Sequence, residues 1–195
     1  DATSAVFGQK VAWKKLDATT FSWQKAMGGE AGHGMLVLSP KAVDRLESYI
    51  PNRPIPKVFR LVKNGRLIEG IFSGETINTP SMLCVADALD SLLWMKELGG
   101  LNATSSKTTK NFNILQDWLD QQDWIENLVI NPAYRSNTSV CLKIIAEEFL
   151  HLSNDKKTKF LKHFVELLKT EKVAYDIGSH RKAPLGLRIW CGATV

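Results

Sequence analysis

The sequence has only three cysteines among its 195 residues, and no two of them have the spacing of a metal-binding or redox motif. Cys84, Cys141 and Cys191 therefore predict reduced thiols, as in a cytosolic protein, rather than a disulfide framework or a zinc site. The histidines also lack metal-ligand spacing, so we expect no metal. No apolar run is long enough to cross a bilayer and no signal peptide is visible, so we expect a cytoplasmic protein without a membrane partner.

Clusters of like charge are also scarce. Lysine and arginine number 25 against 20 acidic residues, which gives a net charge of +5 and favours an anionic partner. These basic residues are scattered, however, and only Asp155–Lys159 resembles a cluster. Because nucleic-acid binding normally requires a basic patch or a recognisable module, we expect no nucleic-acid partner. A basic interaction domain for some other anionic partner remains the non-enzymatic alternative.

Helix and strand signals alternate along the first half of the chain and predict an α/β fold. The apolar run at residues 34–39 predicts a short buried strand, and a helix should follow from Pro40 and end before Pro51. Residues 51–74 predict a long loop with a hairpin at Asn64–Gly65.

The clearest helix follows this loop. Thr79 suits its N-cap, Pro80 suits its first position, and Gly99–Gly100 should end it. Its apolar residues recur on one face, which should lack part of its cover in a fragment: Met82, Val85, Leu89, Leu92 and Leu93.

From about Leu101 the sequence predicts a second α/β unit. Its helix, two strands, second helix and closing strand should lie at residues 112–119, 127–130, 139–145, 160–168 and 185–195. The predicted domains are therefore residues 1–104 and 105–195.

Lys25 has an unusual setting, because it follows the small, aromatic and amide residues Ser22–Gln24 and precedes several glycines. These glycines are Gly28, Gly29, Gly32 and Gly34. Most lysines are solvated surface residues, which is the simplest interpretation. A Schiff-base lysine, in contrast, must be partly desolvated and needs a backbone that a cofactor can approach closely. The glycines and the apolar run beyond them fit this second interpretation.

Asp1 also has two interpretations. An aspartate before Thr and Ser commonly caps a turn. A carboxylate upstream of a Schiff-base lysine could instead keep a pyridine nitrogen protonated, and so maintain the electron sink of pyridoxal phosphate.

Five motifs, taken in order, resemble the phosphoserine aminotransferases, and more narrowly their alphaproteobacterial branch. They are DATSAVF, SWQKAMGGEAGHGMLVLSP, GETINTPSMLCVADAL, RSNTSVCLKI and HRKAPLGLRIWCG. The resemblance implies a fold-type-I, pyridoxal-phosphate-dependent transaminase of serine biosynthesis, which interconverts 3-phosphohydroxypyruvate plus glutamate with O-phosphoserine plus 2-oxoglutarate. It also implies part of a large domain with a mostly parallel sheet, followed by a small C-terminal α/β domain.

The resemblance assigns cofactor roles to residues near the start of the chain. Lys25 would form the Schiff base and, once released, would shuttle the substrate proton. Asp1 would pair with the pyridinium nitrogen, and Gln24 would bind the cofactor phosphate, although a buried amide satisfied by the backbone is an equally simple reading of Gln24. Thr3 or Ser4 would contact the cofactor ring or its oxygen.

The resemblance also implies a homodimer with shared sites. Asn78 and Thr79, at a helix start suited to anions, would reach the phosphate of the neighbouring subunit's cofactor. Arg188 would clamp the substrate α-carboxylate with its planar fork, although such an arginine is more often a structural ion-pair partner. His180 and Arg181 would hold the distal phosphate or carboxylate, and His180 lies one residue further from Arg188 than in the better-known bacterial pattern.

Two further expectations follow from the resemblance. Alanine–glyoxylate transaminases and cysteine desulfurases share this scaffold, so the fold leaves other substrates open. A desulfurase needs a nucleophilic cysteine on a mobile loop, which none of the three cysteines provides. The chain starts at Asp1 without Met, and the family's phosphate cradle and ring-stacking residue precede this aspartate. We therefore expect a C-terminal fragment that is not a competent enzyme alone.

Overall fold

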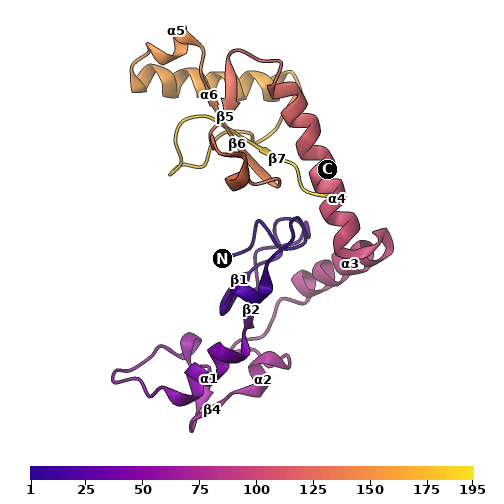
Figure 1. The fold of residues 1–195 in the computed structure, drawn as a ribbon, viewed down its shortest axis with the longest axis vertical. Helices are drawn as coiled ribbons and strands as arrows, with labels where there is room; N and C mark the ends of the chain where they lie inside the picture. Colours follow the sequence, from indigo (N-terminus) through magenta and orange to yellow (C-terminus); the bar gives the residue numbers. More distant parts are fainter. The chain divides into compact units, whose positions relative to one another are not determined.

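A computed structural model describes all residues from Asp1 to Val195, with helices and three small sheets (Figure 1). The chain divides into two compact units, of residues 1–6 with 10–97 and of residues 7–9 with 98–195. The mixture of helices and strands confirms the α/β class. Every strand pair is antiparallel, however, so the parallel pairing expected for a large domain is not found among these residues.

A β-hairpin carries the segment around Lys25 in the first unit. Strand β1 (Ala18–Phe21) pairs antiparallel with β2 (Met35–Leu38), from Ala18 opposite Leu38 to Phe21 opposite Met35. The prediction found β2 but missed β1. The expected burial of β2 is wrong, because its residues are exposed or only half-buried. The hairpin matters because it fixes both ends of the loop that contains Lys25.

Helix α1 (Pro40–Ser48) begins as its sequence predicts. The hydroxyl of Ser39 accepts a hydrogen bond from the amide of Ala42 at 3.1 Å, and Pro40 occupies the first position, where a missing N–H costs nothing. Ser39 also donates to the carboxylate of Asp17 at 3.0 Å, which ties the start of the helix to the residue before β1.

A second hairpin follows at the predicted turn. Strands β3 (Val62–Lys63) and β4 (Arg66–Leu67) flank Asn64 and Gly65, which both have positive φ and so suit a tight two-residue turn. The remaining short elements are 3₁₀ turns and single-turn helices: η1 (Trp13–Lys15), η2 (Lys57–Phe59), α2 (Glu69–Phe72), η3 (Pro132–Tyr134) and α5 (Glu147–Leu150).

Helix α3 (Met82–Leu98) starts later than predicted. Ser81 caps it, because its hydroxyl accepts from the amide of Cys84 at 3.4 Å and its carbonyl accepts from the amide of Val85. The prediction that Thr79 is the N-cap is therefore wrong. The buried residues of α3 are Ala88 and Met95. The apolar residues of the predicted face are exposed: Met82, Val85, Leu89, Leu92 and Leu93.

Helix α4 (Gly100–Leu119) begins well before the predicted helix at residues 112–119. Gly99 and Gly100 have positive φ and separate it from α3, but the helix starts at once after this break. Thr104 is fully buried, and its hydroxyl donates to the carbonyl of Leu101 at 3.1 Å. Packing thus overrides the weak helix propensity of this segment. The predicted domain boundary, between residues 104 and 105, lies inside α4 and stays a prediction.

The second unit is built on an antiparallel sheet of order β5-β6-β7, formed by Ile125–Asn127, Ser139–Ile144 and Leu187–Trp190. The predicted strand at residues 127–130 is thus displaced toward the N-terminus, whereas β6 and β7 lie within their predicted segments. Helix α6 (Asn154–Thr170) confirms the predicted second helix.

The main hydrophobic core belongs to this second unit. Alternate residues of β6 are buried, as a one-faced strand requires. The buried residues of the hydrophobic core are Leu119, Ile125, Val140, Leu142, Ile144, Phe149, Leu161, Leu187 and Cys191. No helix of the protein is both long and apolar enough to span a membrane.

Candidate functional site

Lys25 lies in a tight turn whose neighbours are buried. Its carbonyl accepts a hydrogen bond from the amide of Gly28 at 2.9 Å, and Gly28 has a φ of 71°, which favours glycine. Trp23, Ala26 and Met27 are buried, whereas Lys25 itself is half-buried. The turn is therefore anchored on both sides of the lysine, and the side chain is partly removed from water.

The glycine-rich loop after Lys25 packs on α3. A Cβ at Gly32 would lie 2.9 Å from the sulfur of Cys84, closer than real contacts allow. Within the loop, the hydroxyl of Ser22 donates to the carbonyl of His33 at 2.6 Å, and the rings of Trp23 and His33 meet edge to face at 5.1 Å. This close packing explains why a glycine is needed at position 32.

Hydrogen bonds connect Asp1 to the Lys25 segment. One carboxylate oxygen of Asp1 accepts from the amide of Thr3 at 2.8 Å and from its hydroxyl at 2.6 Å. The Thr3 hydroxyl in turn accepts from the amide of Ser22 at 3.2 Å, three residues before Lys25. Asp1 therefore does cap a local turn, as the simpler interpretation holds. Its second oxygen accepts no hydrogen bond within the chain and can pair with another group.

Gln24, Asn78 and Thr79 are all exposed. The amide of Gln24 makes no hydrogen bond within the chain, so the reading of Gln24 as a buried, satisfied amide is wrong. Asn78 and Thr79 lie in the irregular segment before Ser81, where the carbonyl of Asn78 accepts from the hydroxyl of Thr76 at 2.5 Å. No hydrogen bond joins these two residues to the Lys25 loop.

Arg188 is held on β7 in the second unit. It lies opposite Cys141 of β6, and its amide donates to the carbonyl of Ile177 at 2.7 Å. Its guanidinium is 4.0 Å from the carboxylate of Asp176, with side chains 30% and 97% exposed respectively. The expected structural ion pair therefore exists. An ion pair with so exposed a partner is weak, which leaves the guanidinium accessible to another carboxylate.

His180 and Arg181 lie on the turn that precedes β7. The Nδ1 atom of His180 accepts a hydrogen bond from the amide of Lys182 at 3.2 Å, and its carbonyl accepts from Ala183 at 2.8 Å. A neutral ring then carries its proton on Nε2, which becomes a donor. Arg181 is exposed and has no ion-pair partner within the chain. Both residues line a cavity of about 500 Å³ against α6.

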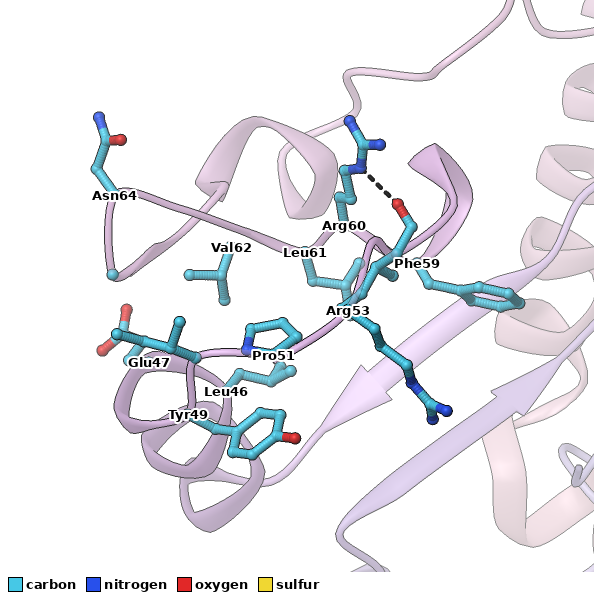
Figure 2. A pocket seen from close by; sticks show the side chains of 13 residues that line it. Leu46, Glu47, Tyr49, Pro51, Arg53, Phe59, Arg60, Leu61, Val62 and Asn64 are labelled. Atoms are coloured by element: carbon cyan, nitrogen blue, oxygen red, sulfur yellow. Dashed lines mark hydrogen bonds between the residues drawn. The ribbon is translucent and has the colours of Figure 1, made fainter.

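Two other cavities contain none of the predicted site residues. One, of about 350 Å³, lies between α1 and the segment that runs to the β3–β4 turn (Figure 2). Figure 2 also shows Arg60, whose Nε donates to the carbonyl of Ile55 at 2.6 Å. The other, of about 530 Å³, is apolar and aromatic, with walls from Trp124, Phe149, Phe160 and Phe164.

The cysteines do not form a reactive site. Cys84 belongs to α3, and Cys141 to β6. Cys191 follows β7 and is buried, and desolvation by burial raises its pKa. Because the thiolate is the reactive form, these positions do not suit the loop nucleophile of a desulfurase.

No protein-family model matches the chain. Curated relatives do match: the chain is 51% identical over all of its 195 residues to phosphoserine aminotransferases of Methanosarcina mazei and Methanosarcina barkeri. The chain is a relative of the phosphoserine aminotransferases. It covers 50% of each of these two relatives, so it spans about half of their length.

The fold agrees with this relationship to phosphoserine aminotransferases. The structure of pyridoxal-phosphate-bound phosphoserine aminotransferase from Trichomonas vaginalis matches with a TM-score of 0.72, over 98% of this chain and 48% of that one. The sequences are 18% identical in this comparison, so it shows a shared fold. The expected fold type is thereby confirmed.

The structure adds two residues to the candidate site, Ser22 and Lys162. Ser22 connects Thr3 to the Lys25 turn, and its place in the SWQK motif was an available signal. Lys162, on α6, lines the same cavity as His180 and Arg181. No local pattern could identify Lys162, because its position depends on how a distant turn packs against the helix.

Proposed function

We propose that the complete protein containing this chain is a pyridoxal-phosphate-dependent phosphoserine aminotransferase of serine biosynthesis. It would interconvert 3-phosphohydroxypyruvate plus glutamate with O-phosphoserine plus 2-oxoglutarate. The observation that carries this proposal is the 51% identity to phosphoserine aminotransferases over all 195 residues. Because the chain spans half of their length, the activity is proposed for the complete protein.

The residues of the first unit fit pyridoxal phosphate. Lys25 is half-buried in an anchored turn, and Asp1 retains one carboxylate oxygen without a hydrogen bond and is linked to that turn through Thr3. Gln24 has an amide available for a phosphate oxygen. When bound, pyridoxal phosphate supplies an electron sink for the charge left by removal of a substrate proton.

Each of these residues has a defined task in the proposed reaction. Lys25 would hold the cofactor covalently and then, as a free amine, take the proton from the substrate α-carbon and return it during the exchange. Asp1 would keep a proton on the ring nitrogen by charge complementarity, as carboxylates stabilise adjacent cations. Gln24 and Thr3 would hold the phosphate and the ring in position.

The second unit would bind the substrate. The guanidinium of Arg188 is planar and accessible, and can hold the α-carboxylate by two parallel hydrogen bonds. The Nε2–H of His180 and the guanidinium of Arg181 would hold the distal phosphate, or the distal carboxylate of glutamate. Asp176 would release Arg188 at little cost because it is almost fully exposed.

We further propose a cytoplasmic homodimer with shared sites, without a membrane or nucleic-acid partner. Asn78 and Thr79 would contact the phosphate of the cofactor in the second subunit. Their exposure, and the absence of hydrogen bonds from their side chains within the chain, supports a contact with another molecule.

The test is a comparison of amino donors and acceptors with the complete protein loaded with pyridoxal phosphate. We expect rapid turnover of O-phosphoserine with 2-oxoglutarate, slow turnover of alanine with glyoxylate, and none from a folded Lys25→Ala variant. Preference for alanine and glyoxylate would support the alternative transaminase. A protein that neither binds the cofactor nor transaminates would support the interaction domain.

A further inference from the structure

The cavity at His180 and Arg181 is completed by helix α6. Its volume is about 500 Å³, and it lies between α6 and the chain segment from Gly178 to Gly186. Helix α6 contributes Thr158 and Lys162, which are one turn apart and therefore on one face. The hydroxyl of Thr158 is already used, because it donates to the carbonyl of Asn154 at 2.9 Å. Lys162 is therefore the α6 residue in this cavity whose side chain can still donate hydrogen bonds to a ligand.

The cavity lining carries more positive than negative charge, with Lys162 and Arg181 against Glu166. Neither Lys162 nor Arg181 has an ion-pair partner in the structure. Glu166 is the one acidic residue that lines the cavity, and its carboxylate lies 3.7 Å from the ammonium group of Lys169. The cavity therefore combines two cations with the Nε2–H donor of His180, an arrangement suited to a dianion.

The position of Lys162 is fixed by the core. The preceding residue, Leu161, is 6% exposed and belongs to the hydrophobic core, which holds the helix in place. The four-carbon stem of a lysine can then bring its compact charge to the cavity mouth while the backbone stays fixed.

We propose that Lys162 is a specificity-determining residue that contacts the phosphate of the substrate, beside His180 and Arg181. This inference rests on the proposed function. A phosphate monoester carries nearly two negative charges at neutral pH and three acceptor oxygens, whereas a carboxylate carries one charge and two oxygens. A third donor therefore favours O-phosphoserine over glutamate, which must use the same site.

The first experiment measures KM values of the complete enzyme with Lys162→Gln. Because a hydrogen bond to a charged group contributes tenfold or more in affinity, we expect the KM for O-phosphoserine to rise roughly tenfold. The KM for glutamate should change about twofold or less, and Lys162→Arg should retain most of the preference. The matched control is Lys159→Gln, which removes the same charge from α6 at a residue that does not line the cavity. An equal rise in both variants, or no rise in Lys162→Gln, would overturn the proposal.

The second experiment does not depend on turnover. Inorganic phosphate should raise the Tm of the complete protein relative to chloride at the same ionic strength, because a ligand that binds only the folded state stabilises it. Lys162→Gln should lose most of this shift, and Lys159→Gln should keep it. Loss in Lys162→Gln with no transamination would refute the proposed function alone. Full retention of the shift in Lys162→Gln, in an active transaminase, would refute only the role of Lys162.

Discussion

At the scale of residues, the observed ion pair of Arg188 leaves room for its proposed role as a carboxylate ligand. Its ion pair with Asp176 is real, at 4.0 Å, but the aspartate is 97% exposed and the arginine 30% exposed. Exposed ion pairs contribute little to stability. The pair therefore leaves the guanidinium available for a substrate carboxylate.

Arg188→Lys in the complete enzyme tests this role. The lysine keeps the charge but loses the planar fork. The fall in kcat/KM should therefore correspond to a loss of about 2 kcal/mol or more in transition-state stabilisation, for every substrate alike. Asp176→Asn is the control, and it should leave kcat/KM and thermal stability nearly unchanged. If the two variants instead lost stability to the same extent and kept their activity, Arg188 would be a structural residue.

Single residues were predictable where a local pattern determined their environment. Lys25 stood out because several glycines follow it in the sequence. The structure places Lys25 half-buried in a glycine-containing turn, as such a sequence favours. The exposure of the Gln24 side chain was not predictable. It depends on the direction of the turn, since Trp23, Ala26 and Met27 in the same turn are buried.

At the scale of elements, the approach of β7 to β6 depends on a glycine. Gly186 precedes β7, and a Cβ at this position would collide with the carbonyl oxygen of Leu142 in β6. Gly186 directly precedes the strand that carries Arg188. A side chain here would push β7 away from the sheet.

Gly186→Ala should therefore lower the free energy of unfolding of the complete protein by roughly 1 to 3 kcal/mol, the cost typical of overpacking. Gly178→Ala is the matched control in the same unit. Its Cβ would meet only Val165, at an ordinary 4.0 Å, so its stability should stay close to that of the parent. Chemical denaturation measures both variants. Equal stability of the two would show that the sheet adjusts to the added carbon.

Elements with strong local signals were predicted, and those that depend on distant partners were not. The cap at Ser39 with Pro40, and the Asn64–Gly65 turn, were visible in the sequence. Strand β1 was missed because four residues without apolar alternation become a strand only by pairing with β2. The start of α4 was missed because its threonines are buried by tertiary packing.

At the scale of the whole molecule, helix α3 presents an apolar face to solvent. Met82 and Leu83 are 74% and 71% exposed, and Met35 and Val37 of β2 are exposed as well. Extended apolar surface of this kind typically marks an interaction surface. Activity and stability should therefore be measured with the complete protein, since the chain spans half of its relatives' length.

A homodimer with shared sites predicts complementation between two inactive variants. Lys25→Ala should lack the reactive amine, and the Asn78→Ala/Thr79→Ala double variant should lack the contact made to the second subunit. In a mixed dimer, one of the two sites would be built entirely from intact parts, so each mixed dimer should recover up to half of the activity of the parent dimer. Subunits that exchange, as shown by mass, and yet give no activity would contradict shared sites.

The most direct test of the central claim is to locate the covalent attachment of pyridoxal phosphate. The complete protein would be incubated with the cofactor, reduced with borohydride, digested, and sequenced by mass spectrometry. The Lys25 turn, half-buried and linked to Asp1 through Thr3, predicts a single reduced adduct on Lys25. An adduct on a different lysine, or an active transaminase with no adduct on Lys25, would contradict the account.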